Sequence, residues 1–371
     1  MPTSVAPDQP APPLPMLRPA GHADAWHNVA APGGYEWWYF DAESDDGRTH
    51  VVAIFLEGFV FHPGYLRAYA RYRRRPTRVP PPRAGNYPCA YLTVYRDGRV
   101  AAQFMTQFAP AAFAADPAGP AVTIGPNTMA LGADGAYRLT LTGTPWVLTA
   151  RGPQLLAART LAAELAFRPT LDTRPAERRF FSRAMSGADH HWVLAAPRCE
   201  VTGTLDLGTG EPLAFAGRGY HDHNFGTGPI GPGLKRWIWG RVLTDDGVVS
   251  FHFARPSDPR LPDEVHLLRA DAGGVADVAC AARVDWSRRT GWLLAYPASA
   301  DFGPELRLAN PRVVDSAPFY MRLTYEAETP GRRGTAFCEV AYPHRLRHPV
   351  LGRMIEMSID KRAARPAPAR T

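Results

Sequence analysis

Residues 217–226, with the sequence GRGYHDHNFG, concentrate side chains that can transfer protons or form hydrogen bonds. Side chains alternate between the two faces of a β-strand, so a strand here places Tyr220, Asp222 and Asn224 on one face and the two histidines on the other. A carboxyl group buried between a phenol and an amide has a raised pKa when desolvation dominates, and it can then act as an acid near neutral pH. The alternative is a polar hairpin in which Asp222 caps a turn.

The two histidines of this run, His221 and His223, raise the question of a metal site, because two imidazoles and a carboxylate suit iron or zinc. On a strand, however, Asp222 points away from that pair, so the three side chains cannot share one ion. The four cysteines are far apart and match no zinc or redox spacing. The sequence also contains no glycine-rich phosphate loop. It therefore predicts neither a metal nor a cofactor.

The elements that would position these residues are short strands. Residues 35–41 and 50–61 are rich in aromatic and apolar residues and flank a turn that contains Asp46 and Gly47, which predicts a hairpin. Similar strands with Gly, Pro and Asp turns recur along the chain, which is typical of an all-β fold of antiparallel barrels or sandwiches. The long key strand is predicted over residues 213–225.

The pattern of strands restarts near residue 190. Because a domain usually has about 100–200 residues, the 371 residues predict two tandem β domains, over residues 26–192 and 193–361. The proline- and alanine-rich residues 1–25 predict a disordered leader. Residues 362–371, which are rich in Ala, Pro and Arg, predict a mobile tail.

The chain carries a net charge of +7, and residues 67–83 contain seven arginines. This segment is either a solvated loop or a basic lid that rests on anionic lipid headgroups. No basic cluster alternates with aromatic residues, so nucleic acid is not an expected partner. The N-terminus lacks the apolar core of a secretory signal, and no apolar run reaches the roughly 20 residues of a membrane span. The expected location is cytoplasmic, with peripheral contact at the inner membrane.

Four segments carry a resemblance to a known family. Residues 34–48 resemble the opening "GYxWWYxDAxSDDGR" of the carotenoid 1,2-hydratase (hydroxyneurosporene synthase) family, and residues 65–75 match its Tyr/Arg-rich segment. Residues 190–197 resemble "HxWxPIAP", and residues 219–241 resemble "GYxDxN … RWxWSR". The resemblance implies two lipocalin-like β domains. The departures are Leu194 in place of a proline, Gly240 in place of a serine, and the histidines at 221 and 223, and they bear on the substrate more than on the fold.

The resemblance implies that the protein adds water to the terminal C=C of an acyclic carotenoid or related long, apolar isoprenoid, with no cofactor. It implies that Asp222 is the acid that protonates the alkene, that Tyr220 holds Asp222 protonated, and that His190 orients the acid or accepts a proton from water. Aromatic rings would stabilise the cation. The residues expected to form this wall and to bind substrate are Trp192, Trp37, Trp38, Trp237, Trp239, Asn224 and Tyr35.

The aromatic residues also have a structural interpretation, because tryptophans in β proteins usually belong to the core. Trp37 and Trp38 are adjacent on a predicted strand, so only one of them can face a cavity. Two other functions remain open for the same scaffold. One is a cyclase or pericyclase of a polyene, and the other is a non-catalytic lipid or carotenoid carrier.

Overall fold

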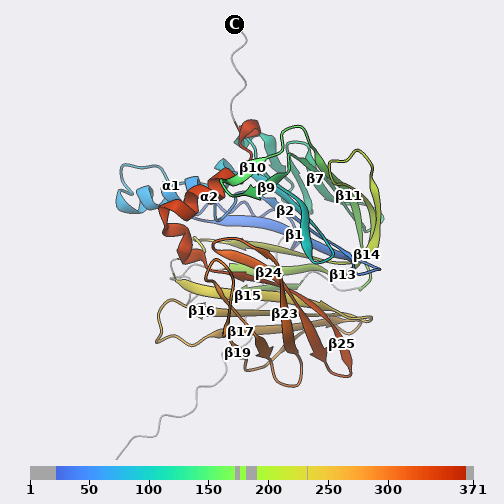
Figure 1. The fold of residues 1–371 in the computed structure, drawn as a ribbon. Helices are drawn as coiled ribbons and strands as arrows, with labels where there is room; N and C mark the ends of the chain where they lie inside the picture. Colours follow the sequence, from blue (N-terminus) through green and yellow to red (C-terminus); the bar gives the residue numbers. More distant parts are fainter. Residues whose placement is uncertain (1–21, 172–175, 181–189, 232, 365–371) are drawn as a thin grey trace, which may run out of the picture.

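The protein is described by a computed structural model that covers residues 22–171, 176–180, 190–231 and 233–364. Two large antiparallel sheets lie one above the other, and they confirm the predicted all-β, lipocalin-like fold (Figure 1). None of the helices in these described segments is long and apolar enough to cross a membrane.

The first sheet has twelve strands in the order β4-β3-β2-β1-β14-β13-β11-β8-β7-β6-β5, with β12 paired to β13. The predicted hairpin is confirmed, because β1 and β2 pair through a turn in which Gly47 has a φ of +68°. The strands are β1 (Tyr35–Ser44), β2 (Thr49–Leu56), β3 (Cys89–Arg96), β4 (Arg99–Gln107), β5 (Phe113–Ala115), β6 (Ala121–Ile124), β7 (Asn127–Leu131), β8 (Tyr137–Gly143), β11 (Leu161–Pro169), β12 (Ala176–Phe180), β13 (His190–Asp206) and β14 (Leu213–Gly226).

The second sheet has nine strands in the order β18-β17-β16-β15-β25-β24-β23-β22-β19. These are β15 (Leu234–Leu243), β16 (Val248–Pro256), β17 (Glu264–Asp271), β18 (Gly274–Val278), β19 (Arg283–Asp285), β22 (Ser299–Asp301), β23 (Arg307–Ser316), β24 (Tyr320–Thr329) and β25 (Arg332–Ala341). Two small hairpins complete the strands: β9 (Trp146–Thr149) with β10 (Gly152–Leu155), and β20 (Arg288–Arg289) with β21 (Ala295–Tyr296).

Two α-helices, α1 (Pro63–Arg74) and α2 (Pro349–Met357), lie at one end of the sheets (Figure 1). The loop expected over residues 67–83 is thus helical in its first half. His62 caps α1 by accepting a hydrogen bond from the Gly64 N–H, and Pro63 takes the first position, where its missing N–H costs nothing. Four short 3₁₀ helices cover η1 (Ala84–Asn86), η2 (Pro110–Ala112), η3 (Pro343–Arg347) and η4 (Arg362–Ala364).

Three apolar clusters organise the fold. One lies within the first curled sheet and contains Trp38, Phe40 and Phe167, and one lies within the second and contains Phe251 and Tyr325. The third cluster joins side chains of both sheets, including β1, β14 and β15. Strands β1 and β14 therefore have one face toward the interior of the first sheet and one face toward the second sheet.

The change from one sheet to the other falls between Gly226 and Leu234. The boundary expected between residues 192 and 193 lies inside β13 instead. The reason is pairing: β13 and β14 form a long ladder with each other, and β14 also pairs with β1 along its second edge. The restart of the strand pattern near residue 190 thus marks the start of β13, which continues the first sheet by pairing with β11.

Both chain ends differ from expectation where the structure describes them. Asp24 and Ala25 are buried, although residues 1–25 were expected to be disordered. Residues 362–364 form η4, and Arg362 pairs with Asp360, although this stretch was expected to be mobile. Residues 1–21 and 365–371 lie outside the described residues.

Buried ionic groups connect the two sheets. Arg241 of β15 donates from Nε to Asp41 of β1 at 2.9 Å, and both side chains are fully buried. Gly240, beside it, lies where an added Cβ would come within 2.6 Å of the Phe251 ring and of the Cys338 sulfur. The close packing explains why this chain has glycine where the related motif has serine. The Arg241–Asp41 pair thus holds β15 of the second sheet against β1 of the first.

Candidate active site

The central strand β14 presents its polar residues as the alternation predicts. Tyr220, Asp222 and Asn224 face the second sheet, while His221 and His223 face the interior of the first. Asp222 lies opposite Tyr39 of β1, and Asn224 lies opposite Trp37. The alternative of a polar hairpin that caps a turn is wrong, because Asp222 lies within a continuous ladder.

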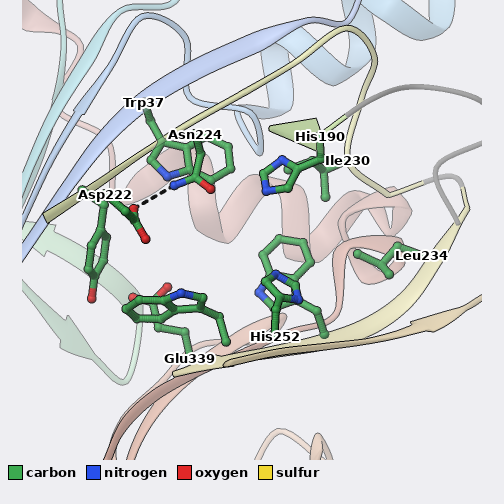
Figure 2. Close-up of a pocket in the computed structure, with 11 residues that line it drawn as sticks. Trp37, His190, Asp222, Asn224, Ile230, Leu234, His252 and Glu339 are labelled. Atoms are coloured by element: carbon green, nitrogen blue, oxygen red, sulfur yellow. Dashed lines mark hydrogen bonds between the residues drawn. The ribbon is translucent and has the colours of Figure 1, made fainter. Parts of the chain in front are cut away.

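Three neutral donors hold the Asp222 carboxyl, which is 2% exposed. The Tyr220 hydroxyl and the Trp192 indole N–H both donate to Oδ2, at 2.8 and 2.7 Å. The Asn224 amide donates to Oδ1 at 2.8 Å (Figure 2). These donors fix the orientation of the carboxyl group without adding a positive charge.

The pKa of Asp222 is raised to about 7, chiefly by burial and to a smaller extent by the nearby Glu339 and Asp41 carboxylates, although the hydrogen bonds from Tyr220 and Trp192 lower it. The expected effect of Tyr220 therefore needs correction. A donor to a carboxylate stabilises the ionised form, so Tyr220 orients the acid and does not hold it protonated. Desolvation keeps the proton on Asp222.

His190 is linked to Asp222 through Asn224. The Tyr35 hydroxyl lies 2.7 Å from His190 Nδ1, and a side-chain hydrogen bond joins the ring to Asn224. Burial, the first cause, lowers the pKa of His190 to about 3, so the ring is neutral. A neutral ring that accepts from Tyr35 and donates to the Asn224 oxygen orients the amide toward Asp222.

A cavity of about 470 Å³ lies between the sheets with Asp222 in its wall. Strands of the first sheet supply one side and strands of the second sheet supply the other (Figure 2). The lining residues are Trp37, Tyr39, His190, Asp222, Asn224, Ile230, Leu234, Trp237, Trp239, His252 and Glu339. The cavity thus combines a proton donor with an aromatic wall.

Most of the aromatic residues expected at the site lie there. Trp37, Trp237 and Trp239 line the cavity. Trp192 contacts Asp222 through its N–H, and Tyr35 contacts His190. Trp38 is an exception, because its ring lies in the core of the first sheet, stacked on His223 at 4.5 Å. Of the two adjacent tryptophans, Trp37 is the one that faces the cavity.

Three polar residues of the cavity were not anticipated: Tyr39, His252 and Glu339. Tyr39 was detectable, because it shares the face of Trp37 on the predicted strand. His252 and Glu339 lie on strands of the second sheet, and neither residue belongs to a sequence motif. Their cross-strand neighbour in both cases is Trp239, so only the register of β15 brings them to the site.

A larger apolar cavity of about 1270 Å³ adjoins the first and shares Trp37, Tyr39, Trp237 and Glu339 with it. It continues between the sheets past Phe59, Phe61 and Phe319 toward β9, β10 and α2. The pair of cavities forms an apolar passage that ends at Asp222.

On the other face of β14, the histidines contact carboxylates. His221 Nε2 lies 3.0 Å from Asp24, and the two ring nitrogens of His223 lie 3.3 Å from Asp24 and 3.0 Å from Glu36. His27 Nδ1 lies 3.1 Å from the same Glu36 oxygen. Among the described residues, His27, Glu36 and His223 are close enough to share a metal ion, with donor atoms within 4.8 Å of one another. In this arrangement, however, they already pair with one another. As expected, Asp222 is not part of this group.

Sequence similarity to known proteins identifies the family of this chain. Residues 174–367 match the family described as "Carotenoid hydratase CrtC". A protein of Chlorobaculum tepidum named hydroxyneurosporene dehydrogenase is 32% identical, over 81% of this chain and 79% of its own. An acyclic carotenoid 1,2-hydratase of Thiocapsa roseopersicina is 29% identical, over 89% of this chain and 74% of its own.

Among solved structures, a putative AttH of Nitrosomonas europaea has a TM-score of 0.59 at 16% identity, covering 91% of this chain and 99% of its own. At this identity the likeness concerns the fold alone. The sequence matches go further: the chain belongs to the carotenoid hydratase CrtC family, whose class of enzyme is the hydro-lyases.

Proposed function

We propose that this protein adds water across the terminal C=C of an acyclic carotenoid or a related isoprenoid, by acid-initiated carbocation chemistry and without a cofactor. The observation that carries the proposal is a carboxyl group that keeps its proton near neutral pH at the end of an apolar passage. The fit of the passage to a long hydrocarbon and the family of the chain support the substrate class.

Asp222 would donate its proton to the less substituted alkene carbon, which leaves a tertiary cation on the neighbouring carbon. The rings of Trp37, Trp237 and Trp239 line the same cavity, and a desolvated cation–π contact contributes about 2 kcal/mol or more. Water then attacks the cation and loses a proton. Alkene and water are thereby converted to a tertiary alcohol, with no change in oxidation state that would require a redox partner.

The alternatives use the same apolar passage differently. A carrier needs the cavity but has no use for a buried carboxyl held by three donors. A cyclase would also use an acid, and the two reactions differ in mass: hydration adds one water, whereas cyclisation leaves the mass unchanged.

The deciding experiment is incubation of the purified protein with lycopene or neurosporene in liposomes prepared in oxygen-18 water. Wild type is expected to give a product heavier by one labelled water, and Asp222→Asn is expected to give none while still binding the polyene. Unchanged ligand from both proteins would contradict hydration and favour the carrier. A skeletal change at constant mass would favour the cyclase.

We also propose peripheral contact with an anionic membrane at the end of the passage. Leu148 lines the larger cavity and is 55% exposed, and α2 carries the exposed Val350 and Met357. The basic helix α1 is tied to α2 by the pair Arg67–Glu356 at 3.2 Å, and α2 lies beside β10 (Figure 1). Exposed apolar residues beside arginines suit a surface of anionic lipid.

Co-sedimentation with vesicles tests this contact. Binding is expected to increase from phosphatidylcholine to phosphatidylglycerol vesicles and to weaken in Leu148→Ser. Leu213→Ser is the matched control, because Leu213 is also exposed but begins β14, away from the passage lining. Equal binding of both vesicle types by wild type would contradict the proposal.

A further inference from the structure

Hydration requires a base as well as an acid, because the attacking water must lose a proton. The inference below rests on the proposed hydration. Asp222 cannot serve as the initial base, since it enters the reaction protonated. The expected alternative was His190, but hydrogen bonds to Tyr35 and Asn224 already engage this ring, and burial holds its pKa at about 3. His190 is therefore a positioning residue and a weak base.

The other histidine in the cavity wall, His252, is also a weak base. Its ring is buried, with its centroid 6.5 Å from that of His190. Burial is the first reason that its pKa lies well below the usual value, and the neighbouring His190 and His266 rings lower it further. A base for the water must come from another group in the wall.

Glu339 provides a carboxylate in the wall of both cavities. It lies on β25, opposite Trp239 on one side and Arg322 on the other. Arg322 Nε donates to Glu339 Oε1 at 2.9 Å, while Arg322 Nη1 donates to the Tyr91 and Tyr95 hydroxyls. The guanidinium thus pairs with Glu339 and keeps it directed to the cavity. Asp222 comes from the other sheet, so acid and carboxylate belong to different walls (Figure 2).

Tyr39 adds a second observation. It lines both cavities and is 4% exposed, yet its buried hydroxyl has no hydrogen-bond partner among the described residues. Glu339 is near enough to contribute, after burial, to the raised pKa of Tyr39. Buried hydroxyls in proteins are nearly always satisfied, often by an ordered water. A water held by Tyr39 would lie in the same cavity as Glu339.

We propose that Glu339 is the catalytic base that takes a proton from the attacking water, and that Tyr39 positions this water. The Asp222 O–H bond breaks and a C–H bond forms, and the water oxygen forms the C–O bond while one of its O–H bonds breaks toward Glu339. Glu339 ends protonated and Asp222 ionised, and solvent exchange restores both. Opposite protonation states of two carboxyl groups in one site are a known arrangement for acid–base catalysis.

Solvent deuterium separates the two proton transfers. In D₂O, Asp222 delivers deuterium to the alkene. A cation that is not captured by water returns a proton to the ionised Asp222, either the original hydrogen of the newly deuterated carbon or one from a neighbouring methyl group, so the recovered alkene carries deuterium. Glu339→Gln is expected to lose hydration by about 10²–10⁴-fold, the usual contribution of a general base, while its recovered alkene still gains deuterium. Asp222→Asn is expected to lose both.

Glu43→Gln is the matched control, because Glu43 also pairs with buried Arg241 near the contact of the sheets but lies outside the cavity lining. It is expected to keep both reactions. Folded Glu339→Gln that hydrates normally, or that loses deuterium exchange together with hydration, would overturn the proposal. Wild type that neither hydrates nor exchanges would instead contradict the proposed function itself.

Should loss of the partner of Arg322 unfold Glu339→Gln, Tyr39→Phe gives the same information. It removes one hydroxyl that has no hydrogen-bond partner among the described residues and leaves the ion pair intact. The ratio of deuterium exchange to hydration is expected to rise about tenfold, within the range of a positioned proton acceptor. An unchanged ratio would overturn the role of the water site.

Discussion

The buried carboxyl groups on the two faces of β14 have pKa values that are shifted in opposite directions. Asp222 on one face and Asp24 against the other are both almost fully buried. Burial raises the pKa of both, but Asp222 receives only neutral donors and reaches about 7. Asp24 contacts the imidazoles of His221 and His223, which lower its pKa below the usual value despite its burial. The charge of the neighbours, and not the degree of burial, separates an acid from a structural ion pair.

The strongest test of this contrast is the same substitution on each face. Asp222→Asn removes the acid and is expected to lower kcat/KM by about 10²–10⁴-fold or more, with little change in stability. Asp24→Asn removes the carboxylate that pairs with His221 and one of the two that pair with His223, and it is expected to lower the free energy of unfolding by about 3–5 kcal/mol. Activity assays and urea unfolding measure the two effects. A free energy of unfolding for Asp24→Asn that is no lower than that of Asp222→Asn would contradict the difference between the two faces.

The pH dependence should also differ between the faces. Since Asp222 must carry its proton, kcat/KM is expected to fall about tenfold per pH unit above pH 7, with no fall between pH 5 and 6. On the other face the pKa of His223 is raised to about 9, because the Asp24 and Glu36 carboxylates outweigh its burial.

The sign for stability follows from linkage. A raised folded pKa means that the stability from the proton on His223 is complete below about pH 6.5 and is lost as the pH rises through 9. Asp24 has a lowered pKa, so its contribution is present above about pH 4 and is lost in acid. Thermal unfolding from pH 3 to 10 should show both losses, whereas activity falls earlier, near pH 7. If stability and activity instead changed over the same pH range, a single titrating group would control both properties.

Trp37 and Trp38, which are adjacent on β1, allow a second comparison between opposite faces of one strand, with smaller expected effects. Trp37→Phe alters the cavity wall and is expected to reduce kcat by up to about 30-fold, which corresponds to about 2 kcal/mol of cation–π contact. Trp38→Phe removes a hydrogen bond to the Asp24 carbonyl in the core. It is expected to cost about 1–2 kcal/mol of stability and to spare kcat. Equal kinetic effects would show that the face of the strand does not decide the role.

Alternation along a strand is a local property, which is why the sequence predicted the shared face of Tyr220, Asp222 and Asn224. The aromatic positions Trp37, Trp237 and Trp239 were predictable for the same reason. The resemblance to the family added the role of the acid. On β1 and β14, alternation thus predicted the placement of Trp37, Tyr220, Asp222 and Asn224, whereas Tyr39 was not anticipated and Trp38 lies in the core.

The remaining residues of the site could not be predicted, because their positions depend on contacts between segments that are distant in the sequence. Glu339 lies in the cavity because β25 pairs with β15, and no local pattern specifies that register. Asp24 follows a proline- and alanine-rich stretch, and composition alone could not show that two histidines of β14 would bury it. The position of the change between the sheets has the same origin, since β14 pairs with β1, which is distant in the sequence, and thereby holds β13 and β14 in the first sheet.

The smallest expected effect concerns the sign of one hydrogen bond. Tyr220 donates to Asp222 Oδ2 at 2.8 Å, and a donated hydrogen bond stabilises the carboxylate. Tyr220→Phe should therefore raise the pKa of Asp222 and move the alkaline limb of the kcat/KM profile to higher pH, by less than about one unit. Trp192→Phe, which removes the other donor to the same oxygen, should move the limb in the same direction. If Tyr220 instead holds the acid protonated, as the family resemblance implies, the limb will move to lower pH in Tyr220→Phe. The direction of this shift decides whether burial alone keeps the proton on the acid, while the paired carboxylates across the strand remain charged.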